Sequence, residues 1–339
     1  MSNLATIQTI KSLEKIENAD KILLAKLDGL AWQVVVKKGE FVVGEMVIFV
    51  ETDTILPNAP WSQFLKDKNQ PDKPIRLKSI KLRGVLSQGL VLGLDEVCVD
   101  RDQVKIGQDF AEGLGIKKYE KPIPAELNGE VVAGFPTNII PITDQKNIQN
   151  FPHILEDYKN ELFYCSIKYD GCSATFYSFD GHFGVCGRNW EYKDDNKTLW
   201  KLAKKYELDK YLADCGNFAI QCECVGPGVN GNKYGFKEHD VYVFDVYDID
   251  NRCYLDPVDM QCFAKGVDMK LCERVFEGMS LYRSMDDMLA IADGTIKVNG
   301  VNRAREGLVF KSMVEKRDYK MGRLSFKAKS NKYSLKNKE

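Results

Sequence analysis

The spacing of apolar and turn residues changes near residue 120, and this break constrains the fold more than any other feature. Short apolar runs separated by turn residues precede the break, whereas runs with both helical and strand spacing follow it. Between them KKYEKPIP, at 117–124, and the later Pro136 and Pro141 interrupt any regular period, because proline cannot continue a helix or a central strand. A chain of 339 residues also exceeds what one compact core usually fills. We therefore predict two domains, 1–120 and 141–339, joined by a linker over 121–140.

The first region reads as a small β-barrel. Short strands that follow one another closely, with glycine at the corners between them, are typical of an OB-like fold. Glycines stand between the expected strands at positions 29, 39, 44, 84 and 89. The expected strands are 6–11, 22–27, 32–36, 46–51, 77–82 and 90–92.

The second region mixes helices with strands, which predicts an α+β domain. Leu199, Leu202 and Ala203 repeat with helical spacing, and the run 285–292 does the same. Strands are expected where apolar or β-branched residues run without that spacing. These segments are 163–169, 174–177, 219–225, 241–248, 307–312 and 323–328.

Composition places the chain among ordinary folded proteins that stay inside the cell. Hydrophobic residues make up 44% and charged residues 29%, which argues against long disorder. No apolar run approaches the roughly 18 residues that span a bilayer, and the first residues lack the layout of a secretory signal. We expect an intracellular protein with no membrane span.

The cysteines indicate reduced thiols. There are ten, scattered without paired spacing, so neither a disulfide framework nor a zinc site is favoured. Cys222 and Cys224 flank Glu223 at alternating positions of an expected strand. They are therefore expected to pack into the core on one face of that strand.

Charged residues stand on or beside several apolar strands of the second region. Lys168, Asp170 and Gly171 form a KxDG sequence where an expected strand enters a turn. One such match arises by chance in about 10% of chains this long, and an exposed lysine at a strand end would explain it. Lys327 and Lys329, however, leave one face of a later strand. Because unpaired buried charge is costly, these cations and the acidic Glu223 and Glu306 indicate a paired or functional site.

In this order the charged segments resemble the motifs of the covalent nucleotidyltransferase superfamily, which contains DNA ligases, RNA ligases and mRNA capping enzymes. The barrel precedes the transferase region instead of following it, which is similar to the Deinococcus and Naegleria type of nick-sealing RNA ligase. The segments WQVVVKKGEFVVGEMVIFVE, IRLKSIKLRGVLSQGLVL and ITDQKNIQN also look like that family. The resemblance implies an adenylation domain of antiparallel sheets flanked by helices. The motif-like positions are Lys168–Gly171, Glu223, Phe244, Glu306, and the pair Lys327 and Lys329.

What the resemblance implies for chemistry is ATP-dependent joining of RNA ends. Lys168 would attack the α-phosphorus of ATP and carry AMP covalently, with Lys327 and Lys329 as the catalytic cations. Like charge from these lysines and from Mg²⁺ or Mn²⁺ would favour the neutral amine that attack requires. The metal would be held by carboxylates, directly or through water. The candidate metal ligands are Asp170, Glu223 and Glu306.

Nucleotide contacts are also implied, with alternatives left open. Glu223 binds either metal or ribose, and Phe244 either stacks on adenine or belongs to the core. Arg188 contacts the nucleotide or forms a surface ion pair. GPGVNGNKYG, at 226–235, lacks the Walker spacing and reads as a turn. The full nucleotide-binding set is Lys146, Gln149, Arg188, Glu223, Phe244 and Glu306.

RNA is the expected partner of a monomeric enzyme. Trp61 and Phe64 precede a basic stretch in the barrel region, and basic residues beside exposed aromatics suit a nucleic-acid backbone. A solvated loop with barrel-packed aromatics is the competing interpretation. Other superfamily enzymes, namely a DNA ligase or a capping guanylyltransferase, and a non-catalytic OB-type binding protein are the alternative functions. The basic stretch comprises Lys66, Lys68, Lys73, Arg76, Lys78, Lys81 and Arg83.

Overall fold

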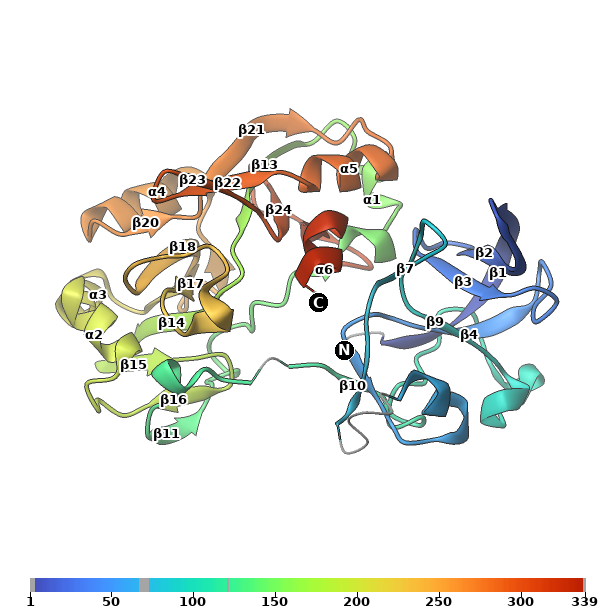
Figure 1. Cartoon of the computed structure of the whole chain (residues 1–339). Helices are drawn as coiled ribbons and strands as arrows, with labels where there is room; N and C mark the ends of the chain where they lie inside the picture. The colour runs from blue at the N-terminus through green and yellow to red at the C-terminus, as the bar shows by residue number, and fades with distance from the viewer. Residues whose placement is uncertain (1–3, 67–72, 121, 338–339) are drawn as a thin grey trace. The chain divides into compact units, whose positions relative to one another are not determined.

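The computed structural model describes residues 4–66, 73–120 and 122–337, which form two compact units (Figure 1). The first unit takes in Met1–Lys121 with Gln149–His153 and Ser334–Glu339, and the second takes in Pro122–Ile148 with Ile154–Tyr333. Lys68 of the basic stretch lies outside the described residues. No helix in the part of the chain described is long and apolar enough to cross a bilayer.

The first unit is the expected OB-like module. A five-stranded antiparallel sheet has the order β3-β2-β1-β4-β9, and a three-stranded sheet has the order β10-β5-β6. The bounds of these strands are β1 Ala5–Ile16, β2 Ala19–Leu27, β3 Gln33–Lys37, β4 Met46–Val50, β5 Thr54–Leu56, β6 Ile75–Leu77, β9 Leu90–Gly93 and β10 Lys117–Lys118.

Strand β4 explains how this small unit obtains a core. Ile48 and Val50 pack into one apolar cluster, while Val47 and Phe49 pack into another on the opposite face. A strand buried on both faces requires an uninterrupted apolar run, which the sequence supplies at this point. Gly89 is fixed beside the strand, because a Cβ there would lie 2.5 Å from the Phe49 ring and 2.6 Å from the Val50 carbonyl oxygen.

The strand predicted at 77–82 is wrong, because two strands occupy that segment. β6 ends at Leu77, and a separate hairpin follows, formed by β7 (Ile80–Leu82) and β8 (Val85–Ser87). Ile80 and Leu82 are exposed, so their apolar character does not mark a core strand. A run of apolar residues cannot by itself reveal a change of sheet.

The second unit contains two antiparallel-rich sheets. One is eight-stranded, with the order β11-β16-β15-β14-β17-β18-β19 and β20 beside β18; the other is five-stranded, with the order β12-β27-β24-β13-β21. The strands of the first are β11 Val131–Gly134, β14 Cys172–Phe179, β15 His182–Cys186, β16 Trp190–Tyr192, β17 Phe218–Val225, β18 Asp240–Asp248, β19 Cys253–Tyr254 and β20 Lys270–Leu271. Those of the second are β12 Lys146–Asn147, β13 Leu162–Lys168, β21 Arg274–Ser280, β24 Gly307–Ser312 and β27 Ser325–Lys329.

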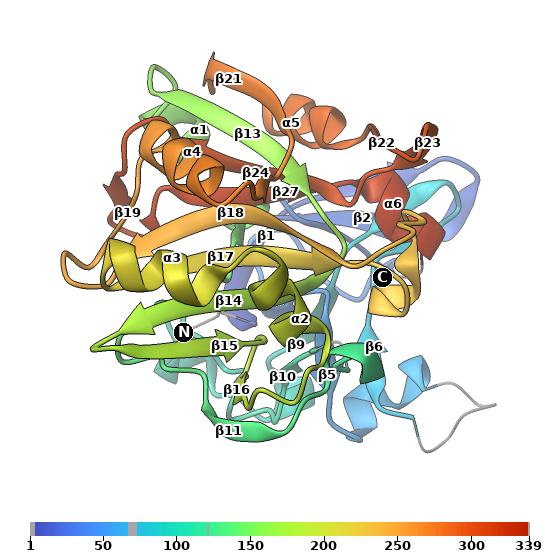
Figure 2. The same ribbon diagram turned by 90° about the vertical axis from the view of Figure 1, so that its left-hand side faces the viewer.

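Helices cover the outer face of the eight-stranded sheet (Figure 2). Helices α2 (Thr198–Lys205), α3 (Leu208–Cys215) and α4 (Pro257–Gly266) bury apolar side chains against β14, β17 and β18. Helix α5 (Met285–Ala292) instead contacts β27 of the other sheet. The helical spacing predicted around Leu199 and over 285–292 is thus confirmed, as is the α+β class. Helix α1 (Ile154–Asp157) and the hairpin of β22 (Thr295–Val298) and β23 (Val301–Ala304) also belong to this unit. The division between the two units falls within helix α6 (Asn331–Asn337).

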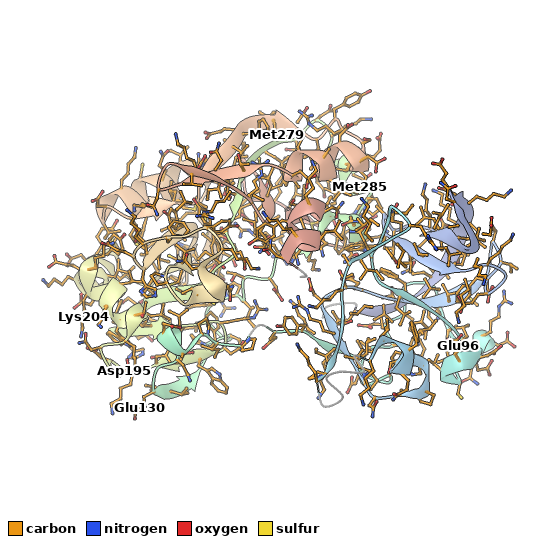
Figure 3. The ribbon with its side chains drawn as sticks, in the orientation of Figure 1. Glu96, Glu130, Asp195, Lys204, Met279 and Met285 are labelled. Carbon is orange, nitrogen blue, oxygen red and sulfur yellow. The ribbon has the colours of Figure 1, made fainter. Side chains whose placement is uncertain are left out.

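Part of the stretch expected as a linker belongs to a sheet. Val131–Gly134 form β11, which pairs with β16. The backbone N–H of Glu130 donates to Asp195 Oδ2 at 3.1 Å, and both residues are labelled in Figure 3. The prolines that suggested a connector flank this strand and do not interrupt it. The strand predicted at 323–328 is likewise divided, since β26 (Gly322–Arg323) ends before β27 begins at Ser325.

A buried ion network joins the two sheets of the second unit. Asp245 on β18 accepts two hydrogen bonds from the Arg323 guanidinium, each 2.9 Å long, and lies 2.9 Å from Lys311 Nζ on β24. Glu315 pairs with the same guanidinium at 2.9 Å. Burial acts most strongly on Asp245 and would raise its pKa, but Arg323 and Lys311 outweigh it, so the pKa is lowered.

Candidate active site

Strand register places three lysines on one face of the five-stranded sheet. Lys168 at the end of β13 pairs with Gly307 on β24, which pairs with Lys329 on β27. Two residues back, Ser166 pairs with Val309, which pairs with Lys327. Paired residues on adjacent strands point to the same side, and alternate residues share that side. The side chains of Lys168, Lys327 and Lys329 therefore leave the same face.

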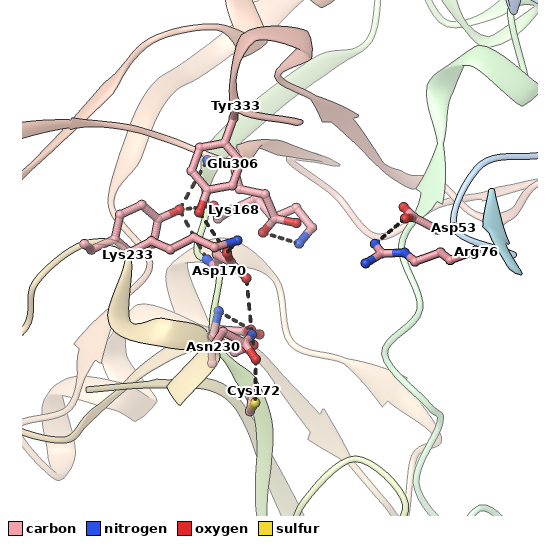
Figure 4. A network of polar contacts seen from close by, with 12 residues as sticks. Asp53, Arg76, Lys168, Asp170, Cys172, Asn230, Lys233, Glu306 and Tyr333 are labelled. Atoms are coloured by element: carbon pink, nitrogen blue, oxygen red, sulfur yellow. Dashed lines mark hydrogen bonds and ion pairs between the residues drawn. The ribbon is translucent and has the colours of Figure 1, made fainter. Parts of the chain in front are cut away.

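An ion pair joins Lys168 to Glu306 (Figure 4). The distance from Nζ to Oε2 is 2.6 Å. The carboxylate is buried, with 4% of the side chain exposed, whereas 24% of the lysine side chain is exposed. The amine is thus held by a buried anion, while part of the lysine side chain stays exposed.

The turn after Lys168 requires the glycine of the KxDG sequence. A Cβ at Gly171 would lie 2.3 Å from the Cys224 carbonyl oxygen and 2.8 Å from Glu223 Cγ. The Gly171 N–H donates to Glu223 Oε1 at 3.0 Å. Cys222 and Cys224 are fully buried in the core on the helix-covered face of β17, so Glu223 between them points to the opposite face, toward the turn.

Asp170 is buried and surrounded by donors. Its carboxylate accepts from Tyr333 Oη at 2.8 Å and from Asn230 Nδ2 at 3.2 Å, and it pairs with Lys233 Nζ at 2.8 Å. Only 1% of its side chain is exposed. Three side chains of the protein thus engage this carboxylate.

The backbone around Glu306 is held from both sides. The buried Arg305 guanidinium donates to the carbonyl oxygens of Ile291, Ala292 and Asp293 at the end of α5. A cation at the carbonyl end of a helix is favourable. The Ser330 N–H donates to the Glu306 carbonyl at 2.8 Å. These contacts fix the residue that faces Lys168.

Phe244 lies on β18, partly buried against an apolar cluster that contains Ile167 and Tyr169. The Lys311 ammonium is 5.6 Å from the centre of its ring and also donates to the Phe244 carbonyl. This packing is the core environment that was one of the two interpretations of Phe244.

The remaining nucleotide candidates have different surroundings. Arg188 pairs with Asp144 at 3.2 Å, and both side chains are over a third exposed. Lys146 is exposed on β12, where it pairs in parallel with Phe326. Gln149 is buried in the first unit and donates to the Ala31 carbonyl at 3.2 Å. Arg188 thus has the surface ion pair that was the alternative to a nucleotide contact.

The carboxylates fit a divalent cation that keeps other ligands. Within residues 4–66, 73–120 and 122–337, no group of three or more His, Cys, Asp or Glu side chains is close enough to hold a metal ion by itself. Mg²⁺ and Mn²⁺ accept oxygen ligands, and Mg²⁺ commonly binds one or two carboxylates together with water and substrate phosphates. Glu223 and Glu306 suit that mode of binding.

Sequence reasoning missed the loop between β17 and β18 as part of the site. It was interpreted as a plain turn, and η6 (Val229–Asn232) does turn the chain there. Yet Asn230, Lys233 and Tyr234 from this loop all contact the KxDG turn. The only signal was the presence of polar and aromatic residues directly beside the glycines.

Comparisons with known proteins agree with this architecture. A family model described as an OB-fold domain matches residues 4–94, and one described as RNA ligase matches residues 161–329. No curated protein sequence matches the chain at a significant level.

Solved structures of Naegleria gruberi RNA ligase are similar over nearly the whole chain. One, described as bound to PPi, is 35% identical, with a TM-score of 0.89, and covers 100% of this chain and 99% of its own. A lysine mutant described with ATP and Mn is 35% identical, with a TM-score of 0.87, and covers 98% and 99%. A glutamate mutant described with AMP and Mn is 35% identical, with a TM-score of 0.88, and covers 99% and 100%.

An OB-like module that precedes a two-sheet domain in the sequence, with a lysine at the KxDG turn, is the architecture of the nucleotidyltransferases that carry their barrel first. Within that class the chain belongs to the RNA ligase family.

Proposed function

We propose that this chain is an ATP-dependent RNA ligase that seals nicks between a 3′-hydroxyl and a 5′-phosphate, through AMP carried on Lys168. The RNA ligase family model and the Naegleria relatives, solved with ATP, AMP, PPi and Mn, support ATP, a divalent metal and RNA as its ligands. The observation that carries the proposal is the partly exposed Lys168 side chain, whose amine lies 2.6 Å from Glu306.

In the first step the Lys168 amine attacks the α-phosphorus of ATP. A phosphorus–nitrogen bond forms, the bond to the departing pyrophosphate breaks, and the amine loses its proton. Lys327 and Lys329 share the face of Lys168. Their positive charge favours the neutral amine and stabilises the negative charge that grows on the phosphates.

In the second step an oxygen of the RNA 5′-phosphate attacks the lysyl-bound phosphorus, and the amine leaves and regains a proton. The product is an RNA end capped by AMP. In the third step the 3′-hydroxyl attacks the capped RNA phosphate, AMP leaves, and the hydroxyl proton is lost. Glu223 and Glu306 would hold Mg²⁺ or Mn²⁺, which supplies charge stabilisation at the phosphates when bound.

We assign supporting roles to the remaining candidates. Phe244 stacks on adenine, and Lys146 and Arg188 contact the nucleotide or its phosphates. Gln149 is buried in the first unit, where it donates to the Ala31 carbonyl, and is assigned no role here. Asp170 orders the turn that carries the nucleophile, since Lys233 and Tyr333 engage its carboxylate. Residues 141–339 form the adenylation domain in this proposal, and residues 1–120 form the RNA-binding module.

Within the module, the exposed side chains suited to RNA differ from the buried ones. Phe64 is 70% exposed, whereas Trp61 packs against the core. Arg76 pairs with Asp53 at 2.7 Å and lies 3.6 Å from the centre of the Tyr119 ring, so it supports the module's own fold. Phe64, Lys81 and Arg83 are therefore the first candidates for backbone and base contact.

The test combines labelling with strand joining. Wild type and Lys168→Met are incubated with α-labelled ATP and Mn²⁺, and then with nicked duplexes that carry RNA or DNA at the 3′-hydroxyl strand. We expect label on wild type only and sealing of the RNA-ended nick. Label on the Met variant would refute the nucleophile, and sealing restricted to DNA ends would refute the RNA preference.

A further inference from the structure

The hydroxyl of Tyr234 meets three backbone groups of the active site at once. It accepts hydrogen bonds from the N–H groups of Asp170 and Glu306, each 3.2 Å long, and it donates to the Lys168 carbonyl at 3.5 Å. One side-chain oxygen thus bridges two segments that are 138 residues apart at the Lys168–Glu306 pair.

These three contacts bracket the reacting groups. The Lys168 carbonyl and the Asp170 N–H lie on either side of the turn that begins at the nucleophile, and the Glu306 N–H belongs to the residue whose carboxylate faces the amine. A shift of either segment relative to the other would change the distance between the amine and the carboxylate. The hydroxyl is the group that ties both segments to one point.

Tyr234 itself has little freedom to move. Its side chain is fully buried, and its ring packs edge to face against Tyr169 and Phe236, with centroid distances of 6.1 Å to each. Burial raises the pKa of the Tyr234 phenol well above its ordinary value, so the hydroxyl keeps the proton that it donates.

The loop that carries Tyr234 is also fixed. Asn232 closes a turn with Phe236 through hydrogen bonds of 2.8 and 2.9 Å. Gly235 has a φ of 72°, where a side chain would be strained, and Asn299 Nδ2 donates to its carbonyl at 2.8 Å. Lys233, the residue before Tyr234, forms an ion pair with Asp170. The loop therefore presents two consecutive side chains to the KxDG turn from a rigid base.

We propose that Tyr234 is a positioning residue for lysine adenylation, which holds Lys168 and Glu306 in the geometry that attack on ATP requires. This inference rests on the proposed function and extends it to a residue that contacts neither reacting atom. Loss of the hydroxyl leaves the aromatic packing in place but removes the shared anchor. Misplacement of reacting groups by about 1 Å can cost about a hundredfold in rate.

The experiment measures a single turnover of lysyl-AMP formation with labelled ATP for wild type and Tyr234→Phe. We expect the rate constant at saturating ATP to fall about ten- to a hundredfold. We expect the ATP concentration for half-saturation to change by less than about twofold, and the final amount of label to equal that of wild type. A loss of folded protein would instead lower the final amount.

Tyr177→Phe is the matched control. It too removes a buried tyrosine hydrogen bond in the same unit, the one that Tyr177 donates to Glu191 Oε2 at 2.8 Å. The rate constant of Tyr177→Phe should stay within about twofold of wild type, even if its melting temperature falls as much as that of Tyr234→Phe. Fluorinated tyrosine at position 234, which keeps the hydroxyl but makes it a weaker acceptor, provides a second variant should Tyr234→Phe not fold. It should slow adenylation in the same sense by a smaller factor.

The outcomes separate the two proposals. Wild-type rate in Tyr234→Phe, or a change confined to ATP half-saturation or to final label, overturns the positioning role. An equal slowing in Tyr177→Phe overturns it as well. If wild type itself takes up no AMP, the proposed function fails instead.

Discussion

Two lysine–carboxylate pairs stand on neighbouring strands of the second unit and differ in how completely they are enclosed. Lys168 on β13 pairs with Glu306 at 2.6 Å, and 24% of the lysine side chain is exposed. Lys311 on β24 pairs with Asp245 at 2.9 Å, and only 4% of that lysine is exposed. Both lysines leave the same face of the sheet, since Lys311 is four residues from Gly307, the partner of Lys168.

The charges of the enclosed pair, Lys311 and Asp245, are balanced by other charges of the protein. Arg323 and Glu315 join Lys311 and Asp245, so two cations face two carboxylates. These four side chains hold the two sheets together, but they leave no net charge to bind a ligand. At the open pair, Lys327 and Lys329 add positive charge to the same face, which suits the phosphates of a nucleotide. Similar side chains thus serve stability in one place and chemistry in the other, and burial and charge balance make the difference.

The largest effect that separates the pairs should come from Asp245→Asn. Removing this carboxylate leaves Lys311 and Arg323 buried with less compensating charge, which typically costs about 3–5 kcal/mol. Urea unfolding monitored by tryptophan fluorescence measures the loss. A change below about 1 kcal/mol would mean that the network is no more than an exposed ion pair in strength.

Glu306→Gln should show the opposite pattern. The amide keeps the shape but loses the carboxylate that would hold Mg²⁺ or Mn²⁺ at the phosphates, so we expect lysyl-AMP formation to slow about a hundred- to a thousandfold. Stability should change far less than in Asp245→Asn, because the Lys168 amine keeps access to water. Single-turnover labelling and urea unfolding of the same preparation provide the two readouts. Adenylation at the wild-type rate by this variant would refute the role of Glu306 in lysyl-AMP formation.

Arg323→Lys tests the geometry of the enclosed network at constant charge. Lysine cannot supply two parallel hydrogen bonds to Asp245, nor reproduce the guanidinium that lies 3.5 Å from the centre of the Tyr254 ring. We expect a loss of about 1.5–3 kcal/mol in unfolding free energy, with adenylation kinetics retained. Slower adenylation at full stability would show that the two pairs are coupled.

The smallest effect is a dependence on acid pH. The pKa of Asp245 is lowered in the folded protein, because Arg323 and Lys311 outweigh burial. Its contribution to stability is therefore complete above the unfolded carboxyl pKa of about 3.9 and is lost as pH falls through the lower folded value. Burial lowers the pKa of Lys311, and this lysine changes the pH dependence of stability only at alkaline pH. Within this pair, the change of stability at acid pH therefore comes from the Asp245 carboxylate.

The difference in unfolding free energy between wild type and Asp245→Asn should consequently be constant at about pH 6 to 5 and narrow as the pH falls below about 4. Because other carboxylates titrate in both proteins, this difference isolates Asp245. A difference that stays constant below about pH 4 would contradict the assigned pKa direction.

The sequence predicted the open pair better than the enclosed one. Strand 307–312 was placed correctly, and Lys168, Glu306, Lys327 and Lys329 were singled out because charge beside apolar strands is costly unless it is used. The same reasoning did not distinguish Lys311, since its partner Asp245 lies on another sheet, and Arg323, which shares that carboxylate, lies on β26. Contacts between sheets depend on packing, which no local pattern encodes.

Tyr234 illustrates the same limit. Its loop lacks the Walker spacing, and its glycines predicted a turn, which is where local reasoning ends. That its hydroxyl reaches the backbone of Asp170 and Glu306 follows only from the folded arrangement of β13, β24 and η6. The split of the segment 77–82 into two strands has a related cause, because apolar residues continue across a change of pairing partner.

The most direct test of the account is to locate AMP on the protein. Wild-type chain incubated with ATP and Mn²⁺ is digested under conditions that preserve phosphorus–nitrogen bonds, and the modified peptide is sequenced by mass spectrometry. The account predicts a single adenylated residue, Lys168. AMP found on Lys233, Lys327 or Lys329, or no adduct on a protein that nonetheless seals RNA, would contradict it.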